Sequence, residues 1–171
     1  AVSSTQAGTL LAGRDLQVRT LPGASLAGIS TLTAGRDLWM SAVNGSVTLS
    51  GVTQITSQTG RLDLVTSQGN LNVAGTSTLQ ASQGLGFSTD TGSVTLQGTS
   101  SLKTTSGALT VQVGTGQIFL KDQSTLEGDS VSLSVTKSGS VNLTNTSTLT
   151  ADTTDISVSV QEGSVLASGS S

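Results

Sequence analysis

The sequence predicts an all-β protein: a right-handed parallel β-helix (β-solenoid) of about seven coils, each with 22–24 residues and three short strands. Two observations lead to this fold class. A glycine recurs at a nearly constant step, and short segments of alternating apolar and polar residues keep the same step. Because the repeat runs through almost the whole chain, we expect a single β-helix segment over residues 1–171, an internal fragment of a much longer repeat protein.

The repeated glycine begins one of the three expected strands. Residues 45–49 and 92–96 both read Gly-Ser-Val-Thr-Leu, in which valine and leucine alternate with polar residues. Such alternation sends apolar side chains to one face of a strand and polar side chains to the other. Consecutive glycines of this set are 23 or 24 residues apart: Gly45, Gly69, Gly92, Gly116, Gly139 and Gly163.

Two further strands are expected in each repeat. One begins with an apolar residue that has an apolar partner two positions later, as Leu62 and Leu64 show. The other has one apolar residue after small hydroxyl residues, as Leu79 shows after Thr76-Ser77-Thr78. The first set is Leu38, Leu62, Leu85, Leu109, Leu133 and Ile156, and the second set is Leu32, Ile55, Leu79, Leu102, Leu126 and Leu149.

Three strands per repeat also suit other all-β arrangements. A propeller blade needs four strands and about 40–50 residues, which is roughly twice this repeat. A meander does not require equivalent residues at a constant step. A coil does, because each residue lies above its equivalent in the next coil and parallel strands pair at ~4.8 Å. The known handedness of parallel crossovers predicts right-handed winding.

Charge and composition exclude several classes of function. The net charge is −3 and no basic run exists, so we expect no nucleic-acid partner. No apolar stretch reaches the roughly 18–20 residues of a membrane span, so no membrane insertion is expected. Cysteine and histidine are absent, so we expect no cofactor, no metal and no enzymatic activity. Only 10% of residues are charged, which favours a monomeric rod with weak self-association.

Two early segments are nearly identical. Residues 10–16 read Leu-Leu-Ala-Gly-Arg-Asp-Leu, and residues 32–38 read Leu-Thr-Ala-Gly-Arg-Asp-Leu. This pattern resembles the haemagglutinin repeats of filamentous-haemagglutinin-like exoproteins of two-partner secretion, which include large adhesins and the stalks of contact-dependent inhibition toxins. The resemblance implies a right-handed β-helix, an outer-membrane barrel as secretion partner, and a secreted or cell-surface location on a Gram-negative bacterium.

The resemblance covers roughly residues 9–50. The Ala-Gly-Arg-Asp box is lost after Asp37, and only Gly60-Arg61-Leu62 remains of it. The Asn-Pro-Asn signature of the family's secretion domain is absent, so the resemblance implies a piece of stalk rather than the export signal. Autotransporter passengers use similar coils and remain an alternative.

The expected function is a non-catalytic structural and adhesive stalk, virulence-associated, that projects or mediates adhesion to a host cell, a bacterial cell or a matrix polysaccharide. Two alternatives stay open. One is a polysaccharide-binding module of a biofilm or host adhesin, and the other is a carbohydrate-active β-helix enzyme. The near-constant repeat length leaves no room for large loops after residue 32, which disfavours the enzyme.

Six residues are candidates for surface recognition. The pairs Arg14-Asp15 and Arg36-Asp37 should stack in successive coils, either as a charged recognition stripe or as charge neutralisation at a corner. Trp39 and Phe119 each lie between two inward apolar residues and should point outward, where a ring can stack on a sugar. We expect them on different faces and several coils apart, and single exposed apolar residues are common.

Carboxylates gather in the C-terminal half of the chain. Calcium needs several converging oxygens, and the Gly-Gly-x-Gly-x-Asp repeat of calcium-binding β-rolls is absent. Glycoside hydrolysis needs paired carboxylates across the scissile bond. We expect Asp129 and Asp152 to stack without forming either site. The acidic residues of this region are Asp122, Glu127, Asp129, Asp152 and Asp155.

Overall fold

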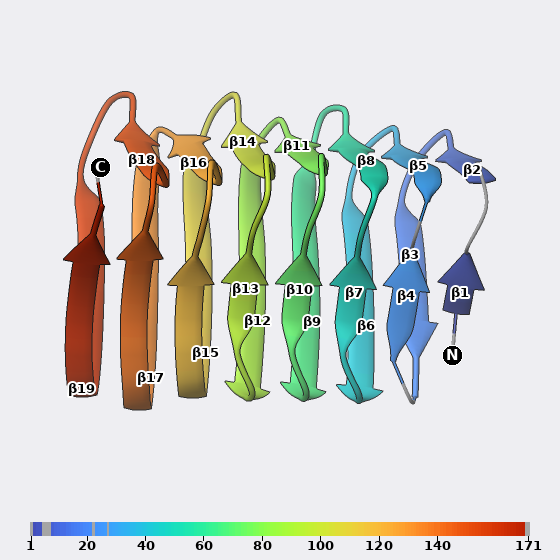
Figure 1. Cartoon of the computed structure of the whole chain (residues 1–171). Helices are drawn as coiled ribbons and strands as arrows, with labels where there is room; N and C mark the ends of the chain where they lie inside the picture. The colour runs from blue at the N-terminus through green and yellow to red at the C-terminus, as the bar shows by residue number, and fades with distance from the viewer. Residues whose placement is uncertain (1, 5–7, 22, 27, 170–171) are drawn as a thin grey trace.

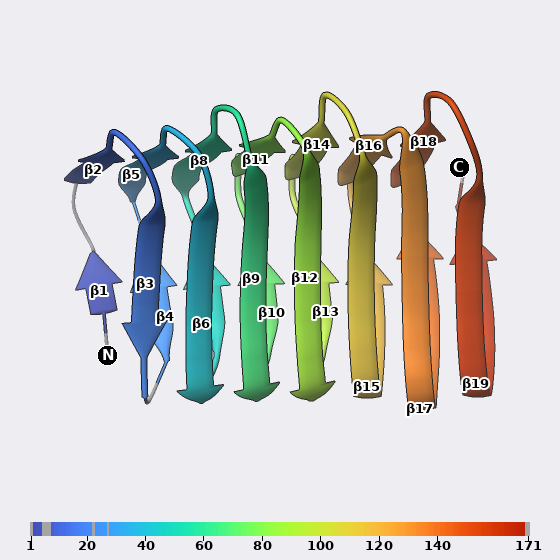
Figure 2. The ribbon, with the colours of Figure 1, turned by 180° about the vertical axis from the view of Figure 1, so that it is seen from behind.

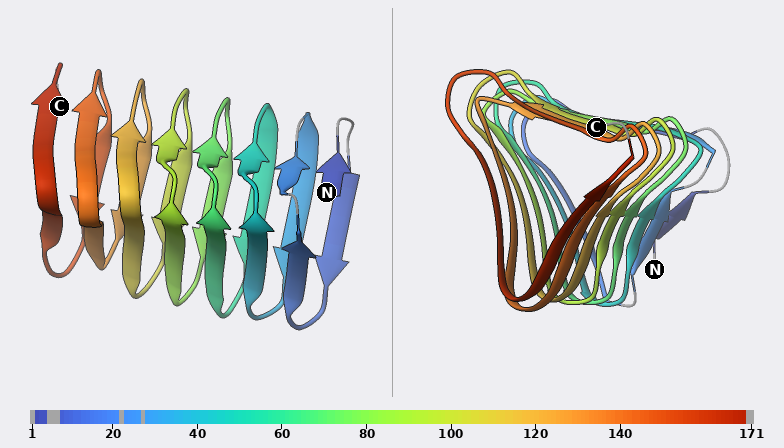
Figure 3. Two further views of the ribbon diagram at one scale, coloured as in Figure 1. Left: turned by 90° about the horizontal axis from the view of Figure 1, so that it is seen from below. Right: turned by 60° about the vertical axis from the view of Figure 1, so that its left-hand side comes forward.

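The computed structural model describes residues 2–4, 8–21, 23–26 and 28–169. In this part of the chain the secondary structure is all β, arranged as a triangular solenoid of about seven turns. Figures 1 and 3 show the coils side by side, with the chain ends at opposite ends of the rod. In Figures 1 and 2 the chain climbs one side, crosses the top and descends on the other side while it advances, which is the right-handed sense. The predicted fold class is confirmed.

Parallel strands form the three faces of the triangle. The first face contains β3 (Leu16–Thr20), β6 (Leu38–Asn44), β9 (Arg61–Gln68) and β12 (Gly84–Thr91). The second face contains β1 (Val2–Ser4), β4 (Ala24–Leu26), β7 (Val47–Leu49), β10 (Leu71–Val73) and β13 (Val94–Leu96). The third face contains β2 (Gly8–Ala12), β5 (Ile29–Ala34), β8 (Val52–Ser57), β11 (Thr78–Ala81), β14 (Ser101–Thr104), β16 (Thr125–Gly128) and β18 (Thr148–Ala151).

Three long strands depart from the expected three short strands per coil. The strands β15 (Ala108–Leu120), β17 (Ser130–Thr144) and β19 (Ile156–Ser168) each run through the first and second faces without a break. The reason is continued pairing at the corner, where Thr115 and Gly116 of β15 stay opposite Ser138 and Gly139 of β17. The backbone therefore bends at a glycine while the parallel ladder continues.

Equivalent residues lie opposite one another in neighbouring coils. On the second face the Cα partners run from Val47 to Leu71, Val94, Ile118 and Val141, the order expected from the repeated glycines. On the third face the expected set from Leu32 to Leu149 is also in register.

The first face differs from the expected register at one point. Leu133 was expected opposite Leu109, but Val131 is the partner of Leu109 and Leu133 is the partner of Val111. The cause is a short corner before β17, where Asp129 alone separates β16 from β17, followed by a bulge between Val135 and Ser138 that restores the register. Because the slip is two residues, the same side chains still point inward.

The core is a stack of mainly aliphatic layers, with Phe87 as its largest fully buried side chain. Leu62, Leu71, Leu79, Leu85 and Leu102 are all fully buried, so all three faces contribute to one interior. The outward neighbours of four of these residues are polar, as period-two alternation predicts, and those of Leu85 are glycines. At the C-terminal coil the same inward positions are more open, and Ile156 and Val165 are exposed.

Small hydroxyl side chains also point inward, on the third face. They precede the apolar residue of that face by two positions, and each is at most 3% exposed. The Ser77 hydroxyl donates to the Ala74 carbonyl at 2.8 Å, and the Ser100 hydroxyl donates to the Gln97 carbonyl at 2.5 Å. Such bonds within the corner satisfy hydroxyls that are costly to bury, but within the described residues those of Ser30, Ser124 and Ser147 have no partner. The column is Ser30, Thr53, Ser77, Ser100, Ser124 and Ser147.

The corner between the second and third faces uses the left-handed backbone conformation in each coil. Gly51, Gly75 and Gly98 have φ of 82°, 78° and 76°, and Asp122 and Asn145 take the same place with φ of 60° and 61°. Aspartate and asparagine tolerate this conformation better than other non-glycine residues. We call this column of residues the left-handed corner.

Replacing Gly75 with alanine should destabilise the solenoid strongly. The left-handed conformation costs an L-residue about 1–2 kcal/mol, and an added Cβ would overlap the Gly51 carbonyl oxygen of the preceding coil. We expect a loss of at least about 2 kcal/mol in the free energy of unfolding, measured by urea denaturation. Gly13→Ala is the matched control, because nothing lies within 4 Å of a Cβ at Gly13. Equal stability of the two variants would contradict this corner geometry.

Candidate recognition surfaces

Four of the six predicted surface residues come together at the corner between the third and first faces. Arg14 and Asp15 follow β2, and Arg36 and Asp37 follow β5 in the next coil. The Arg36 amide donates to the Arg14 carbonyl at 3.1 Å, so the two Arg-Asp segments stack as expected. We call this surface, together with Arg61 in the third coil, the charged corner.

An ion pair joins the first two coils at the charged corner. Arg36 donates to both carboxylate oxygens of Asp15, from Nε at 3.0 Å and from Nη2 at 2.6 Å. These hydrogen bonds lower the pKa of the Asp15 carboxyl below its usual value, and the Asp37 amide contributes a further, weaker bond. The pair is about half exposed, so its contribution to stability is small.

The ladder continues into the third coil. The Asp37 carboxylate accepts a hydrogen bond from the Arg61 amide at 2.9 Å. The Arg61 side chain in turn lies 3.4 Å from the Asp63 carboxylate. Gly60 is required here, because a Cβ at that position would overlap the Asp37 carboxylate. Each of these aspartates thus accepts a hydrogen bond from a backbone amide or an arginine side chain, although in the third coil Arg61 replaces the aspartate and Asp63 lies two residues further on.

Trp39 lies beside the charged corner on the outer side of the first face. Its neighbours on β6, Leu38 and Met40, are each 1% exposed, whereas the Trp39 side chain is only half-buried. Its Cα partners in the adjacent coils are Gln17 on β3 and Asp63 on β9. The predicted outward orientation is confirmed, and Trp39 belongs to the same surface as the arginines.

Phe119 lies elsewhere, as expected. It is half-buried on the outer side of the second face, between its Cα partners Thr95 and Asn142. The Lys121 ammonium lies 4.6 Å from the centre of its ring, a cation–π contact that covers part of one ring face. Phe119 is therefore not part of the charged corner or of the Trp39 surface.

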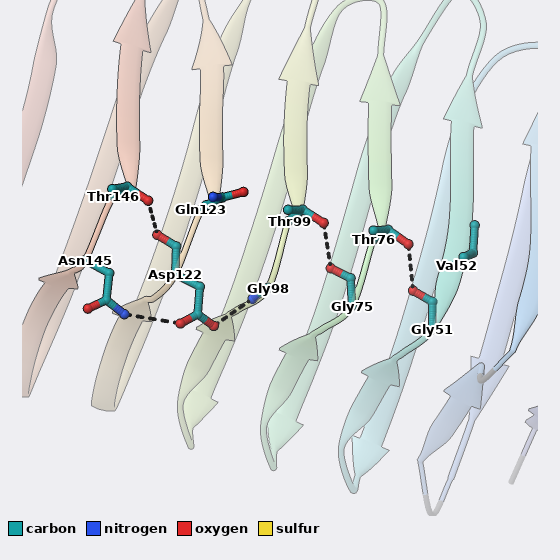
Figure 4. A pocket seen from close by; sticks show the side chains of 10 residues that line it. All are labelled: Gly51, Val52, Gly75, Thr76, Gly98, Thr99, Asp122, Gln123, Asn145 and Thr146. Atoms are coloured by element: carbon teal, nitrogen blue, oxygen red, sulfur yellow. Dashed lines mark hydrogen bonds between the residues drawn. The ribbon is translucent and has the colours of Figure 1, made fainter.

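A second surface feature is a shallow groove along the left-handed corner (Figure 4), with a volume of about 730 Å³. Its floor is backbone, and the Thr76, Thr99 and Thr146 hydroxyls each donate to a carbonyl of the preceding coil. The groove is thus the outer surface of the turn ladder. The lining residues are Gly51, Val52, Gly75, Thr76, Gly98, Thr99, Asp122, Gln123, Asn145 and Thr146.

Three of the five acidic residues of the C-terminal half, Asp122, Glu127 and Asp129, have side-chain partners within the fold. The Asp122 carboxylate accepts from the Gly98 amide at 3.0 Å and from the Asn145 side chain at 3.2 Å, as Figure 4 shows. The Asp129 carboxylate accepts from the Gly107 amide at 2.7 Å, and its carbonyl accepts from the Thr154 amide. Within the described ranges, no group of three or more acidic side chains is placed to hold a metal ion. No described segment forms an apolar helix of membrane-spanning length.

Two features of these surfaces escaped sequence reasoning. Arg61 and Asp63 extend the charged corner although the Ala-Gly-Arg-Asp box has been lost by that point. The left-handed corner was missed because its glycines give way to Asp122 and Asn145. A signal was available, since Asp122 follows Gly98 by 24 residues and Asn145 follows Asp122 by 23.

Removing the Arg36 side chain should raise the pKa of Asp15. In Arg36→Gln we expect this pKa to rise toward the ordinary value of a free aspartate, as measured by NMR titration of the carboxyl carbon. Because the folded-state pKa lies below the unfolded value, the pair stabilises the fold above the unfolded pKa and loses this effect as pH falls through the folded pKa. Arg14→Gln removes the same charge without the hydrogen bonds and should have a smaller effect. Equal shifts in the two variants would refute the bidentate pair.

Comparisons of the chain with protein-family models, with curated proteins and with solved structures find no match. The function is therefore inferred from the residues and from their placement on the solenoid. Two surfaces stand out in that placement, the charged corner with Trp39 beside it and the groove along the left-handed corner.

Proposed function

We propose that the chain is a non-catalytic stalk segment of a large secreted bacterial surface protein of the filamentous-haemagglutinin-like class. In this role the coils form a stiff rod that projects or mediates adhesion to a cell or to a matrix polysaccharide. Export through an outer-membrane barrel partner and a place on a Gram-negative surface belong to the same proposal. Their support is the repeated Leu-x-Ala-Gly-Arg-Asp-Leu pattern at residues 10–16 and 32–38.

The observation that supports a stalk best is the parallel pairing that continues from coil to coil. Each strand of the third face pairs with its equivalent in the next coil, from β2 to β18, and the other two faces do the same. Each coil therefore contacts mainly its neighbours, which gives a length that depends only on the number of coils. Each added coil extends the rod by ~4.8 Å.

The placement of the carboxylates supports a role without catalysis. Asp37, Asp122 and Asp129 each accept a hydrogen bond from a backbone amide of a neighbouring coil. These hydrogen bonds use the acceptor oxygens of the carboxylates within the fold, between one coil and the next. These side chains serve the corners of the rod.

A display experiment on a cell surface tests the stalk. The whole chain is placed between an outer-membrane anchor and a peptide tip that binds a soluble receptor. Two variants are compared with it: deletion of one full repeat, residues 93–116, and deletion of half a repeat, residues 93–104. The full deletion keeps the columns aligned, because Val94 and Ile118 are Cα partners. We expect it to retain receptor binding at the tip and resistance to trypsin, whereas the half deletion should lose trypsin resistance.

Two results would count against the proposal. Trypsin could cut the complete chain as fast as it cuts a flexible linker of equal length that contains the same number of lysines and arginines. Alternatively, the two deletions could behave alike. Either result would mean that the coils do not form the protease-resistant rod that a stalk requires.

A further inference from the structure

We propose that Trp39 is the centre of a glycan-binding subsite on the first face, formed with Ser41, Arg19 and Asp63. The ligand class is a hexopyranose unit of a polysaccharide. This inference deepens the proposed function and rests on it only in placing this face outside the cell. The indole would stack on one face of the sugar ring, and the polar neighbours would bond its hydroxyls.

The first step is the exposed indole. Trp39 is the only tryptophan of the chain. Its side chain points outward from the first face and is half-buried, and the other outward residues of this face are mostly hydroxyl, amide or charged residues. Tryptophan combines a large apolar face with one N–H donor, and it is enriched where proteins bind partners. A pyranose has an apolar face of C–H groups and a polar rim, which matches such a platform.

The second step is the surface on one side of the indole. Asp63 is the Cα partner of Trp39 in the next coil, and Gly86 of β12 is one coil further on. A Cβ on Gly86 would overlap the Asp63 carboxylate, so this carboxylate extends over Gly86. Strand β9 lies between β6 and β12, and the carboxylate therefore leans away from Trp39. The Asp63 carboxylate, which also lies 3.4 Å from the Arg61 side chain, would accept hydrogen bonds from a sugar unit that extends from the indole across β9.

The third step is an unsatisfied hydroxyl. Ser41 follows Trp39 by two residues and lies on the same outer side of β6, yet it is only 6% exposed. Its hydroxyl has no hydrogen-bond partner within the described part of the chain. The Ser30, Ser124 and Ser147 hydroxyls also lack a partner but face the interior, whereas Ser41 is on the outer side of its strand, where a ligand or a water molecule would reach it.

Arg19 supplies the donor for the other side of the subsite. It is the Cα partner of Ser41 on β3, and its side chain is exposed. Arg19 is not among the ion pairs of the described residues, which are Arg36–Asp15, Arg61–Asp63 and Lys103–Glu127. An exposed guanidinium at this position would donate to sugar hydroxyls or to a uronate carboxylate.

The single tryptophan makes a direct test possible. The chain contains no tyrosine, so its near-ultraviolet emission reports Trp39. A hexamer of β-1,4-linked glucose and a hexamer of galacturonate are titrated separately into the whole chain. We expect one or both to shift the emission and to protect Trp39 from acrylamide quenching. Binding of only the acidic hexamer would show that the uronate carboxylate, paired with Arg19, is needed for affinity. Binding of the neutral hexamer would show that stacking on the indole is sufficient without a charged group.

Variants then assign the site. Trp39→Ala should weaken binding at least about tenfold by calorimetry, and Trp39→Phe should retain part of it. Phe119→Ala is the matched control, since it removes an outward aromatic ring from another face and should leave affinity unchanged. Circular dichroism and the melting temperature show whether each variant is folded. If Trp39→Ala does not fold, the emission shift and the quenching protection in the unmodified chain still show whether a sugar binds at Trp39.

The subsite is refuted if neither hexamer changes Trp39 emission, if Trp39→Ala binds within twofold of the unmodified chain, or if Phe119→Ala loses affinity equally. In each of these cases a trypsin-resistant rod would still leave the stalk in place. Rapid digestion of the unmodified chain would instead count against the stalk, so the two failures are distinguishable.

Discussion

Every feature of this protein depends on parallel backbone pairing between equivalent residues of successive coils. The corners show the constraint most clearly, because there the backbone must turn while its amides still meet the carbonyls of the preceding coil. At the left-handed corner the Thr76 amide donates to the Gly51 carbonyl at 2.8 Å, and the Thr99 amide donates to the Gly75 carbonyl at 2.9 Å. A residue that breaks one of these hydrogen bonds disturbs the two coils that it joins. The left-handed backbone conformation therefore recurs at this corner from coil to coil.

At some corners a side chain, rather than a backbone carbonyl, accepts the hydrogen bond from a backbone amide of the next coil. Between the first and second faces, the Ser46 hydroxyl accepts from the Asn70 amide at 3.0 Å, and the Asn70 side chain accepts from the Ser93 amide at 2.8 Å. At the charged corner the Asp37 carboxylate accepts from the Arg61 amide in the same way. The abundance of small polar residues therefore has a physical cause: short side chains with acceptors can reach the next coil at ~4.8 Å.

The sequence was sufficient to predict the repeat, because the core requires apolar residues at a constant step. The inward positions of Leu62, Leu79 and Val94 follow from alternation alone, and all three are fully buried. The two-residue slip at Leu133 could not be predicted, since either register places an apolar residue inside and only the one-residue corner at Asp129 decides between them. The continuous strands β15, β17 and β19 likewise depend on pairing at the corner, which leaves no mark in the hydrophobic pattern.

The surface was less predictable than the core. The stacking of Arg36 above Asp15 follows from the repeat, but the loss of the motif hid the continuation through Arg61 and Asp63. Likewise, alternation places Trp39 outside, whereas the buried hydroxyl of Ser41 on the same side of β6 depends on how neighbouring side chains cover it. Outward positions tolerate many residues, so their arrangement must be read from the structure. A rod built in this way can change its outer surface from coil to coil without changing its core.

The in-register stack can be measured directly by the distances between spin labels on one outward column of the second face. Thr48 and Asn142 are separated by four coil steps through their Cα partners, and Leu166 lies one step further. At ~4.8 Å per step, labels at Thr48 and Asn142 should lie about 19 Å apart, and labels at Thr48 and Leu166 about 24 Å apart. Electron–electron double resonance that gives two narrow distributions differing by one strand spacing is the predicted result. Distances that do not grow with the number of repeats would contradict the solenoid and the functions inferred from it.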